Sequence, residues 1–365
     1  MKFAMLGLGA AVAVCLLGLP PRGAVALDRP EVTFKIFQFP PDRIPRINGK
    51  ADDWAIVPEE YAIGGDQLVN DSNAAVKMDP KSLEVKVKVG WVKGESRLYF
   101  LYEATDDVCD YGQPGLHNDT FEVVVDGDKS GGNFLATNYP DKSISRWDAW
   151  FLMQGVQAQN YHIMLPAVDK DWCMAWGPQA WWIKKMPWSN YSATCTAKPG
   201  EAGKVTATFW ITPFDHADAA GPEKSTASKL VEGNTIGLSW AIMDYDDPKN
   251  ERHAFWNLSR THTMYGDADH LCAFKLMPLE PQFLKKIDAD WTFKLADEKT
   301  RTIAFHDESI GKITAWKWDF GDNTTSTEQN PQHAYKAAGN YIVTLEVEGP
   351  EGKSKREKIW DVTVK

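Results

Sequence analysis

The 365-residue chain has 50 acidic and 40 basic residues, a formal net charge of −10, and sixteen tryptophans. This charge repels phosphate backbones and anionic lipid surfaces, so it argues against nucleic acid and membrane as partners and leaves neutral polymers such as polysaccharides. The length exceeds that of one ordinary domain, and we expect two.

Residues 1–26 have the pattern of a signal peptide. A positive residue precedes an apolar run at 3–19, and Ala-Val-Ala at 24–26 matches the small-x-small cleavage pattern. A lipid anchor on Cys15 is the alternative, although Val14 stands where lipid attachment favours a small residue. No other apolar run approaches the ~18 residues that span a bilayer. We therefore expect a secreted protein, extracellular or periplasmic, without membrane insertion.

The next part of the chain shows the two-residue periodicity of half-buried β-strands. The predicted strands are 83–91, 98–104, 121–125, 205–211 and 236–242. A Gly-containing turn joins the first two, which predicts a hairpin. Strands at this spacing, broken by Gly, Pro and Asp and without a long amphipathic helix, predict an all-β sandwich.

Seven tryptophans gather within 42 residues, and several lie beside Pro, Gly, Asp or Lys, which is typical of loops. They are Trp147, Trp150, Trp172, Trp176, Trp181, Trp182 and Trp188. Aromatic side chains on loops can form a flat platform that stacks on a ligand. The alternative is that they fill a small satellite core beneath the loops. Four other tryptophans are expected in the main core: Trp54, Trp91, Trp210 and Trp240.

The local sequence suggests which of these residues would hold a ligand. The candidate ligand-binding residues are Trp172, Trp176, Trp181 and Trp182, with Asp171 and Gln179 as partners for hydroxyl groups. Trp181 and Trp182 are adjacent and would face opposite sides of a strand, so one of them is expected in the core.

Four cysteines lie outside the predicted signal peptide, and in an exported protein they permit two disulfides with three possible pairings. The favoured pairing joins Cys173 to Cys195 and closes off the tryptophan-rich segment. It leaves Cys109 with Cys272. No pair has CxxC spacing, so a zinc site is not expected.

Two acidic clusters are candidate cation sites. Asp126, Asp128 and Ser130 offer oxygen ligands at alternate positions, as at the start of a calcium loop. No glutamate follows at the twelfth position and no helices flank the loop, so a solvated turn is the default interpretation and a structural calcium the alternative. The second cluster either lines a groove or caps a sheet edge; its members are Asp106, Asp107, Asn118 and Asp119.

The strand pattern lapses after Pro278 and resumes near Asp290, and we place a domain boundary between residues 283 and 284. The predicted domains are 27–283 and 284–365.

The C-terminal part carries three spaced motifs. They are W-D-F-G-D at 318–322, P-x-H-x-Y at 331–335 and G-x-Y-x-V-T-L at 339–345. In this combination the segment resembles the PKD (polycystic kidney disease) domain. The resemblance implies an immunoglobulin-like β-sandwich that acts as a spacer or adhesion module, in which His333 and Tyr335 are structural. Asn323 stands where the family usually has Gly, and Asn also tolerates left-handed backbone.

The larger N-terminal part shows a second order of motifs. They are I-N-G-K-A-D-D-W at 47–54, L-Y-F at 98–100 with T-D-D at 105–107, N-D-T-F-E-V-V-V-D at 118–126 and I-T-P-F at 211–214. This order resembles carbohydrate-binding module family 9 and its DOMON-type relatives over roughly residues 42–278. The resemblance implies a β-sandwich that binds glycans by aromatic stacking and holds structural calcium. It carries over no individual ligand residue.

Catalytic motifs were not found in the sequence. The histidines at 253, 262 and 270 lack metalloprotease spacing, and there is no G-x-S-x-G or phosphate loop. A glycosidase pair of carboxylates is defined by their distance in space, so the large number of acidic residues does not indicate whether such a pair exists. We expect a non-catalytic carbohydrate-binding protein with a PKD spacer that also offers a surface for extracellular protein partners. No cofactor other than a structural calcium is expected.

Two alternatives remain. One is a haem b-binding DOMON-like electron carrier, with a methionine and a His or Lys as ligands; the candidate methionines are Met153, Met164, Met174, Met186 and Met243. The other is an interaction module of an extracellular assembly. A visible absorption spectrum separates the haem protein from the carbohydrate-binding protein.

Overall fold

The computed structural model describes residues 27–113, 118–134, 143–153, 155–168, 170–175, 178–246, 254–260 and 262–364. The predicted signal peptide, Cys15 and Trp176 lie outside these residues. The chain divides into two compact units between Leu279 and Glu280. None of the helices in the described ranges has the length and apolar character needed to cross a membrane.

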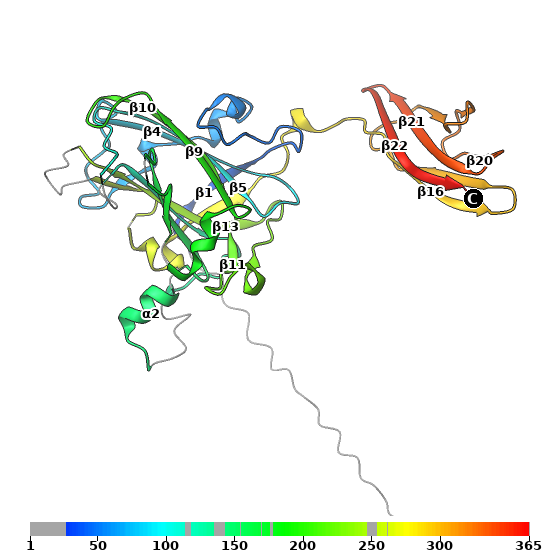
Figure 1. Cartoon of the computed structure of the whole chain (residues 1–365). Coiled ribbons are helices and arrows are strands. Elements are labelled where there is room, and N and C mark those ends of the chain that lie inside the picture. Colours follow the sequence, from blue (N-terminus) through cyan, green and yellow to red (C-terminus); the bar gives the residue numbers. More distant parts are fainter. Residues whose placement is uncertain are drawn as a thin grey trace, which may run out of the picture. The chain divides into compact units, whose positions relative to one another are not determined.

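The first unit is a β-sandwich of two sheets, which appear as two layers in Figure 1. Sheet A has the order β8-β7-β6-β13-β15-β1, and β14 joins β13 to β3. Its strands are β1 (Asp28–Gln38), β3 (Val69–Asn70), β6 (Thr120–Asp126), β7 (Gln159–Met164), β8 (Cys173–Ala175), β13 (Thr235–Asp244), β14 (Ala254–Asn257) and β15 (Cys272–Leu276).

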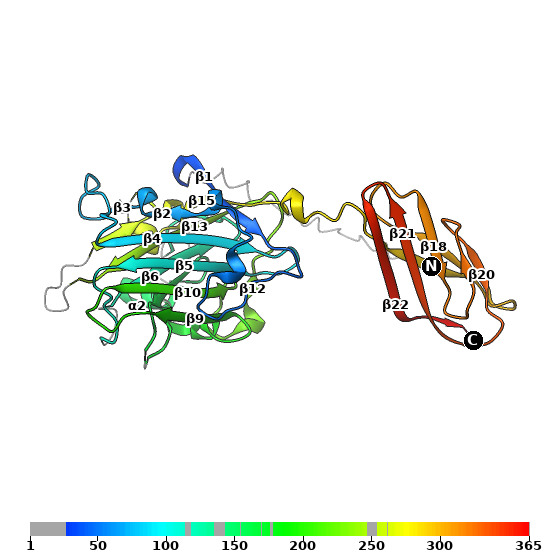
Figure 2. The ribbon, with the colours of Figure 1, turned by 90° about the horizontal axis from the view of Figure 1, so that it is seen from above.

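Sheet B has the order β1-β4-β5-β10-β9, and β2 pairs with β4. Its further strands are β2 (Ile63–Gly64), β4 (Leu83–Trp91), β5 (Leu98–Asp106), β9 (Ser189–Cys195) and β10 (Gly203–Ile211). Figure 2 shows β4, β5, β10 and β9 side by side. Strand β1 belongs to both sheets, because Thr33–Ile36 pair with β15 and Phe37–Gln38 pair with β4.

Short elements connect the strands. They are α2 (Arg146–Met153), the 3-10 helices η1 (Asp52–Trp54), η2 (Glu59–Tyr61), η3 (Gly65–Gln67), η4 (Pro178–Lys184), η5 (Pro222–Lys224), η6 (His262–Tyr265) and η7 (Ala268–His270), and the small hairpin β11 (Phe214–His216) with β12 (Thr226–Ala227).

The five strands predicted from alternation are confirmed as β4, β5, β6, β10 and β13. The predicted hairpin pairs Leu83 with Asp106 at one end and Trp91 with Leu98 at the other. Alternation produces this result because successive side chains of a strand point to opposite faces. One face of each sheet is therefore apolar, and the two apolar faces meet.

Aromatic rings fill the space between the sheets. Phe209 of β10 stacks on Phe100 of β5 with ring centroids 4.6 Å apart. Phe121 of sheet A lies 5.3 Å from Tyr102 and 6.1 Å from Phe209, both of sheet B. Each buried ring contributes roughly 1.5–3 kcal/mol through removal of apolar surface from water, so this cluster holds the two sheets together.

All four of the tryptophans expected in the core are buried. Trp91 and Trp240 lie in the core between the sheets, as predicted, whereas Trp54 and Trp210 are buried outside that cluster. Trp210 differs from the others, because the Arg97 guanidinium covers its ring at 4.2 Å from the centroid. A cation–π contact therefore contributes to the burial of this side chain.

The second unit has two sheets, with the orders β16-β17-β20 and β19-β18-β21-β22. Its elements are η8 (Pro281–Phe283), β16 (Trp291–Asp297), β17 (Thr302–Asp307), β18 (Ala315–Asp319), β19 (Thr325–Ser326), β20 (Gln332–Ala334), β21 (Gly339–Gly349) and β22 (Gly352–Val364). Its core contains Trp291, Trp318, Phe305, Phe320, Val343, Leu345 and Val347.

The motif residues of this unit serve its packing. The His333 ring stacks on Phe320 with centroids 4.2 Å apart, and its Nε2 lies 2.8 Å from Asp322 Oδ2. The Tyr335 hydroxyl donates to the Phe320 carbonyl at 3.1 Å. Asn323 has φ of 66°, the left-handed conformation expected where the family carries Gly.

Candidate functional site

The tryptophan-rich segment runs from β8 through η4 to β9, and two of its predicted ligand residues are packing residues. The Trp172 ring stacks on Tyr191 with centroids 5.2 Å apart, and its Nε1 donates to the Lys184 carbonyl at 3.1 Å. Trp182 packs edge-on against Trp188 and Phe214. Both rings are half-buried against the sandwich core, so the satellite-core alternative holds for them.

Trp181 is the exposed member of the segment. Its side chain is 56% exposed, while the adjacent Trp182 donates its Nε1 proton to the Asp218 carbonyl at 2.9 Å. One of the two was expected in the core, which is confirmed. The two side chains point in different directions because they lie on the 3-10 helix η4, and not because of the alternation along a strand that was expected from the sequence.

Charged groups are fixed beside the exposed indole. The Lys184 ammonium lies 5.1 Å from the centroid of the Trp181 ring, an interaction of cation and aromatic face. The same ammonium pairs with Asp171 and donates to the Cys173 carbonyl at 3.0 Å. The structure therefore groups Trp181, Lys184 and Asp171. Sequence reasoning missed Lys184, although its position three residues after Trp181 places the two on one side of a helical turn.

Two predicted ligand residues have no described side chain. Trp176 lies outside the described residues, and Gln179 is described only in its backbone, within η4. Their roles stay predictions.

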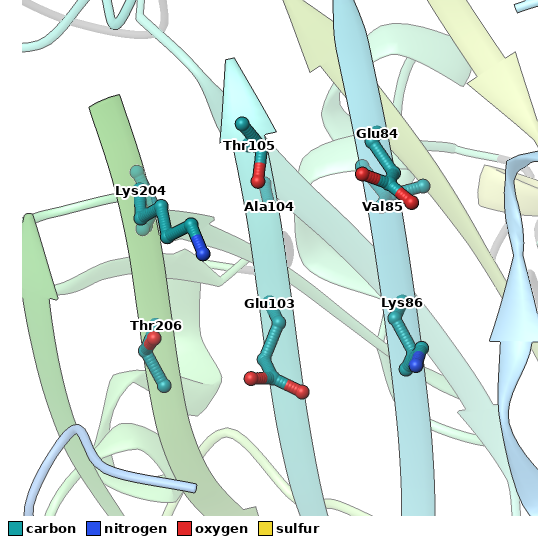
Figure 3. Close-up of a pocket in the computed structure, with 9 residues that line it drawn as sticks. Glu84, Val85, Lys86, Glu103, Ala104, Thr105, Lys204 and Thr206 are labelled. Atoms are coloured by element: carbon teal, nitrogen blue, oxygen red, sulfur yellow. The ribbon is translucent and has the colours of Figure 1, made fainter. Parts of the chain in front are cut away.

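A second candidate surface is a shallow groove on the outward face of sheet B. Figure 3 shows its polar residues on β4, β5 and β10, which are Glu84, Lys86, Glu103, Thr105, Lys204 and Thr206. The groove is lined by no aromatic residue, and Lys86 pairs with Glu59 at 3.0 Å. It therefore lacks the flat apolar surface that a sugar ring needs and is the weaker glycan site.

Carboxylates gather at the rim of the sandwich where β5 and β13 end and β6 begins. Asp106, Asp119 and Asp244 have carboxylate oxygens within 4.8 Å of one another, and Asp106 forms a second such group with Asp107 and Asp246. Burial raises the pKa of Asp119 to about 9 and that of Asp244 to about 8, and neighbouring carboxylates add to both shifts. Burial likewise raises the pKa of Asp106 to about 6.

This acidic rim fits a divalent cation. Asp244 is 6% exposed and its Oδ1 has no hydrogen-bond partner. A buried carboxylate oxygen without a donor is costly, and hard oxygen ligands of this kind suit Ca²⁺. Asp106, Asp119 and Asp244 are therefore the residues that would hold the calcium implied by the sequence resemblance. Sequence reasoning grouped the first two but not Asp244, which is distant in the chain.

The calcium loop predicted at Asp126, Asp128 and Ser130 is a hydrogen-bonded turn. The two Asp126 carboxylate oxygens accept from the backbone amides of Ser130 and Gly131, at 3.2 and 2.8 Å. Asp128 Oδ1 also accepts from the Ser130 amide at 3.0 Å. These oxygens cap the turn, as in a solvated turn, and oxygens of Asp106 and Asp119 at the rim accept backbone amides in the same way. Calcium at this loop stays a prediction.

A buried acid between two histidines was not anticipated from the sequence. Glu122 of β6 lies on the outward face of sheet A, 3.5 Å from His162 Nε2 on β7. Asn160 donates to the same oxygen, Oε1, at 2.7 Å, while Glu122 Oε2 lies 2.5 Å from His262 Nε2 on η6. Burial lowers the pKa of His262, but the hydrogen bond and charge of Glu122 outweigh this and raise it above its usual value. This cluster attaches η6 to the sheet.

The four cysteines in the described ranges are free thiols, so neither predicted disulfide is present. The pairing of Cys173 with Cys195 is wrong for this structure. Cys173 is buried, with Lys184 and Asp171 as its charged neighbours. In contrast, burial raises the pKa of the Cys109 thiol, and the nearby Cys195 thiol adds to that rise. Cys272 lies 3.8 Å from the Ser259 hydroxyl.

The candidate haem ligands are spread over several elements. Met164 and Met243 are buried and both pair with Thr120 on the outward face of sheet A. Met174 lies on β8 and Met186 is exposed. The side chain of Met153 lies outside the described part. The haem alternative stays a prediction.

The acidic rim gives a first test. Adding Ca²⁺ should raise the melting temperature of the protein, because a ligand present at 100 times its Kd stabilises the folded state by ~2.7 kcal/mol. Asp244→Asn removes one charge and should abolish this increase, while Asp128→Asn should retain it. Differential scanning calorimetry with and without Ca²⁺ measures the effect. An equal increase in Asp244→Asn and wild type would contradict the assignment.

The acid–histidine cluster gives a second test. Glu122 raises the pKa of His262 in the folded protein. The pair therefore stabilises the fold fully at pH values below the unfolded histidine pKa of ~6.5. This stabilisation is lost as the pH rises through the pKa of His262 in the folded protein. His262→Gln should cost about 1.5–3 kcal/mol at pH 6, the range for a hydrogen bond to a charged group, and less at pH 9. Urea unfolding of the wild type and of His262→Gln at both pH values measures this cost. The variant keeps the other charged groups of the cluster, which are Glu122, His162 and Asp71. If His262→Gln lost as much unfolding free energy at pH 9 as at pH 6, or more, the role of this ion pair would be contradicted.

Comparison with known proteins gives a family for the C-terminal residues. The family model of the PKD domain matches residues 286–364. Collagenase ColA of Bacillus cereus is 45% identical over 67 residues, which are 17% of this chain and 7% of the collagenase, within the PKD part. The pre-pro-metalloprotease PrtV of Vibrio cholerae is 47% identical over 47 residues, 13% of this chain and 5% of PrtV. The chain thus covers only a small part of the length of these curated relatives.

Solved structures similar to the chain fall into two groups. A carbohydrate binding module family 9 (CBM9) from Caldicellulosiruptor kristjanssonii, in complex with glucose, is 12% identical with a TM-score of 0.43 and covers 68% of this chain and 98% of that chain. The PKD1 domain of the Vibrio cholerae metalloprotease PrtV is 27% identical with a TM-score of 0.20 and covers 22% of this chain and 98% of that chain. Residues 286–364 are therefore a PKD domain, and they follow a larger β-sandwich whose order of motifs resembles that of carbohydrate-binding module family 9.

Proposed function

We propose that the chain is an exported, non-catalytic carbohydrate-binding protein in which a glycan stacks on Trp181. The observation that carries this proposal is the exposed Trp181 ring beside the fixed Lys184–Asp171 ion pair. The order of sequence motifs in residues 42–278 supports the same function.

A pyranose ring and this group of residues are chemically matched. The axial C–H groups of a sugar form one apolar face, which stacks on a flat indole, while its hydroxyls need donors and acceptors at the edge of the ring. The exposed Asp171 supplies carboxylate acceptors, and Lys184 keeps one N–H beyond those given to Asp171 and the Cys173 carbonyl. Because the two are already paired with each other, little side-chain freedom is lost when the sugar binds.

The tryptophans packed behind the site position it. The Nε1 proton of Trp172 bonds the Lys184 carbonyl, so Trp172 fixes the residue that carries the ammonium. Trp182 anchors η4 through the Asp218 carbonyl and its contact with Phe214. We therefore assign Trp172 and Trp182 to positioning, and keep Trp176 and Gln179 as proposed ligand contacts.

The carboxylates of the rim favour binding over catalysis. Asp106, Asp119 and Asp244 are each at most 6% exposed, so a polysaccharide has little access to the closest group of acids. A glycosidase places its two carboxyl groups on either side of the scissile bond. We propose that the rim holds calcium for stability and that the PKD domain is a spacer or adhesion module.

Substitution of the exposed tryptophan tests the function and the site separately. We expect the protein to be retained on at least one polysaccharide or array glycan, and Trp181→Ala to weaken binding at least tenfold. A tenfold loss of affinity corresponds to ~1.4 kcal/mol of binding free energy. Truncation of a central aromatic contact costs ~2 kcal/mol or more, so the loss should be at least tenfold. Affinity electrophoresis and a glycan array measure both.

Trp147→Ala is the matched control, because Trp147 is 69% exposed and lies on α2. Its binding should equal that of the wild type. Retention on no glycan would overturn the function, and unchanged retention of Trp181→Ala would overturn the site alone. A Soret band in the purified protein would favour the haem alternative.

A further inference from the structure

Cys109 and Cys195 lie together although the chain between them spans much of the first unit. Cys195 is the last residue of β9, where it pairs with Val205 of β10. Val205 and Cys109 are both buried in the core between the sheets, and Cys195 packs against that core. Paired residues of neighbouring strands share a face, so the Cys195 side chain points inward, toward Cys109.

Backbone hydrogen bonds fix Cys109 beside the β9–β10 hairpin. The Cys109 amide donates to the Glu201 carbonyl at 3.0 Å, and the Gly200 amide donates to the Cys109 carbonyl at 2.8 Å. Residues 200 and 201 lead into β10. The Tyr111 hydroxyl also donates to the carbonyl of Ala197, two residues after Cys195. The segment carrying Cys109 is therefore held against the hairpin on both sides of the thiol.

The two thiols face the same part of the core. Burial raises the pKa of the Cys109 thiol, and the nearby Cys195 thiol is the second cause of that rise. Burial also raises the pKa of Tyr111, and the same Cys195 thiol adds to that rise. The other two cysteines have different surroundings. Cys272 lies 3.8 Å from the Leu258 carbonyl, and the charged neighbours of Cys173 are Lys184 and Asp171.

We infer that Cys109 and Cys195 form a disulfide when the protein meets an oxidant, a pairing that differs from the one predicted from sequence. With a small-molecule disulfide such as oxidised glutathione, one protein thiolate attacks a glutathione sulfur and releases one glutathione thiol. The second protein thiolate then attacks the mixed disulfide and releases the other. The two protein thiols lose two protons and two electrons, and oxidised glutathione is reduced to two thiols.

The bond would act on the acidic rim. Cys109 lies in the segment between β5 and β6, which also carries Asp107 and Asp119. A covalent link to β9 would hold this segment in place and close a long loop of the unfolded chain, which is the usual source of stabilisation by a disulfide.

Non-reducing peptide mapping tests the inference. The full chain is incubated with oxidised and reduced glutathione, remaining thiols are alkylated, and tryptic peptides are identified by mass spectrometry. We expect peptide 98–129 joined to peptide 186–204, with the pair lost after reduction by dithiothreitol. The melting temperature of the oxidised protein should exceed that of the reduced protein by several degrees.

Two variants sharpen the result. Cys173→Ser should keep the joined peptides, and Cys109→Ser should lose both the joined peptides and the thermal shift. Alkylation of both Cys109 and Cys195 in the oxidised wild type would overturn the inference. So would a bond from Cys195 to Cys173 or Cys272.

Discussion

The contact of Phe121 with Tyr102 and Phe209 is the interaction on which the larger unit depends. It joins sheet A to sheet B, and Trp240 extends it at 5.8 Å from Phe121. Because this packing fixes how the sheets face each other, it also fixes which strand ends share a rim. Asp106 of sheet B meets Asp244 of sheet A and Asp119, which directly precedes β6, there for that reason. Burial and the neighbouring carboxylates raise the pKa values of all three.

The tryptophan-rich segment shows how one residue type serves two purposes. A half-buried indole needs a partner for its N–H group, and both Trp172 and Trp182 find a backbone carbonyl. Their rings cover the edge of the core, so the loop they belong to has a defined conformation. Trp181 remains at the surface with Lys184 and Asp171 held beside it. A rigid aromatic surface with fixed polar neighbours is what recognition of a sugar requires.

Much of the fold could be predicted from the sequence, because strand periodicity is a local property. The β4–β5 hairpin and the inward stripe of β21 at Val343, Leu345 and Val347 follow from alternation alone. The PKD motifs were equally informative, and His333 and Tyr335 take structural positions.

The site was predictable only in part, since side chains distant in sequence build it. Asp244 joins Asp119 at the rim only after β13 has paired with β6. The Cys173–Cys195 pairing was favoured because both flank one segment, but β9 turns Cys195 toward the part of the core that holds Cys109. Lys184 was not among the residues predicted from the sequence, because only the turn of η4 places it against Trp181.

The most direct test of the account is ¹⁹F NMR of protein labelled with 5-fluorotryptophan, titrated with an oligosaccharide that the protein retains. The Trp181 resonance, assigned by its loss in Trp181→Phe, should shift on saturation, while those of the buried Trp91 and Trp240 stay in place. A shift confined to other resonances, with that of Trp181 unchanged at saturation, would contradict the account.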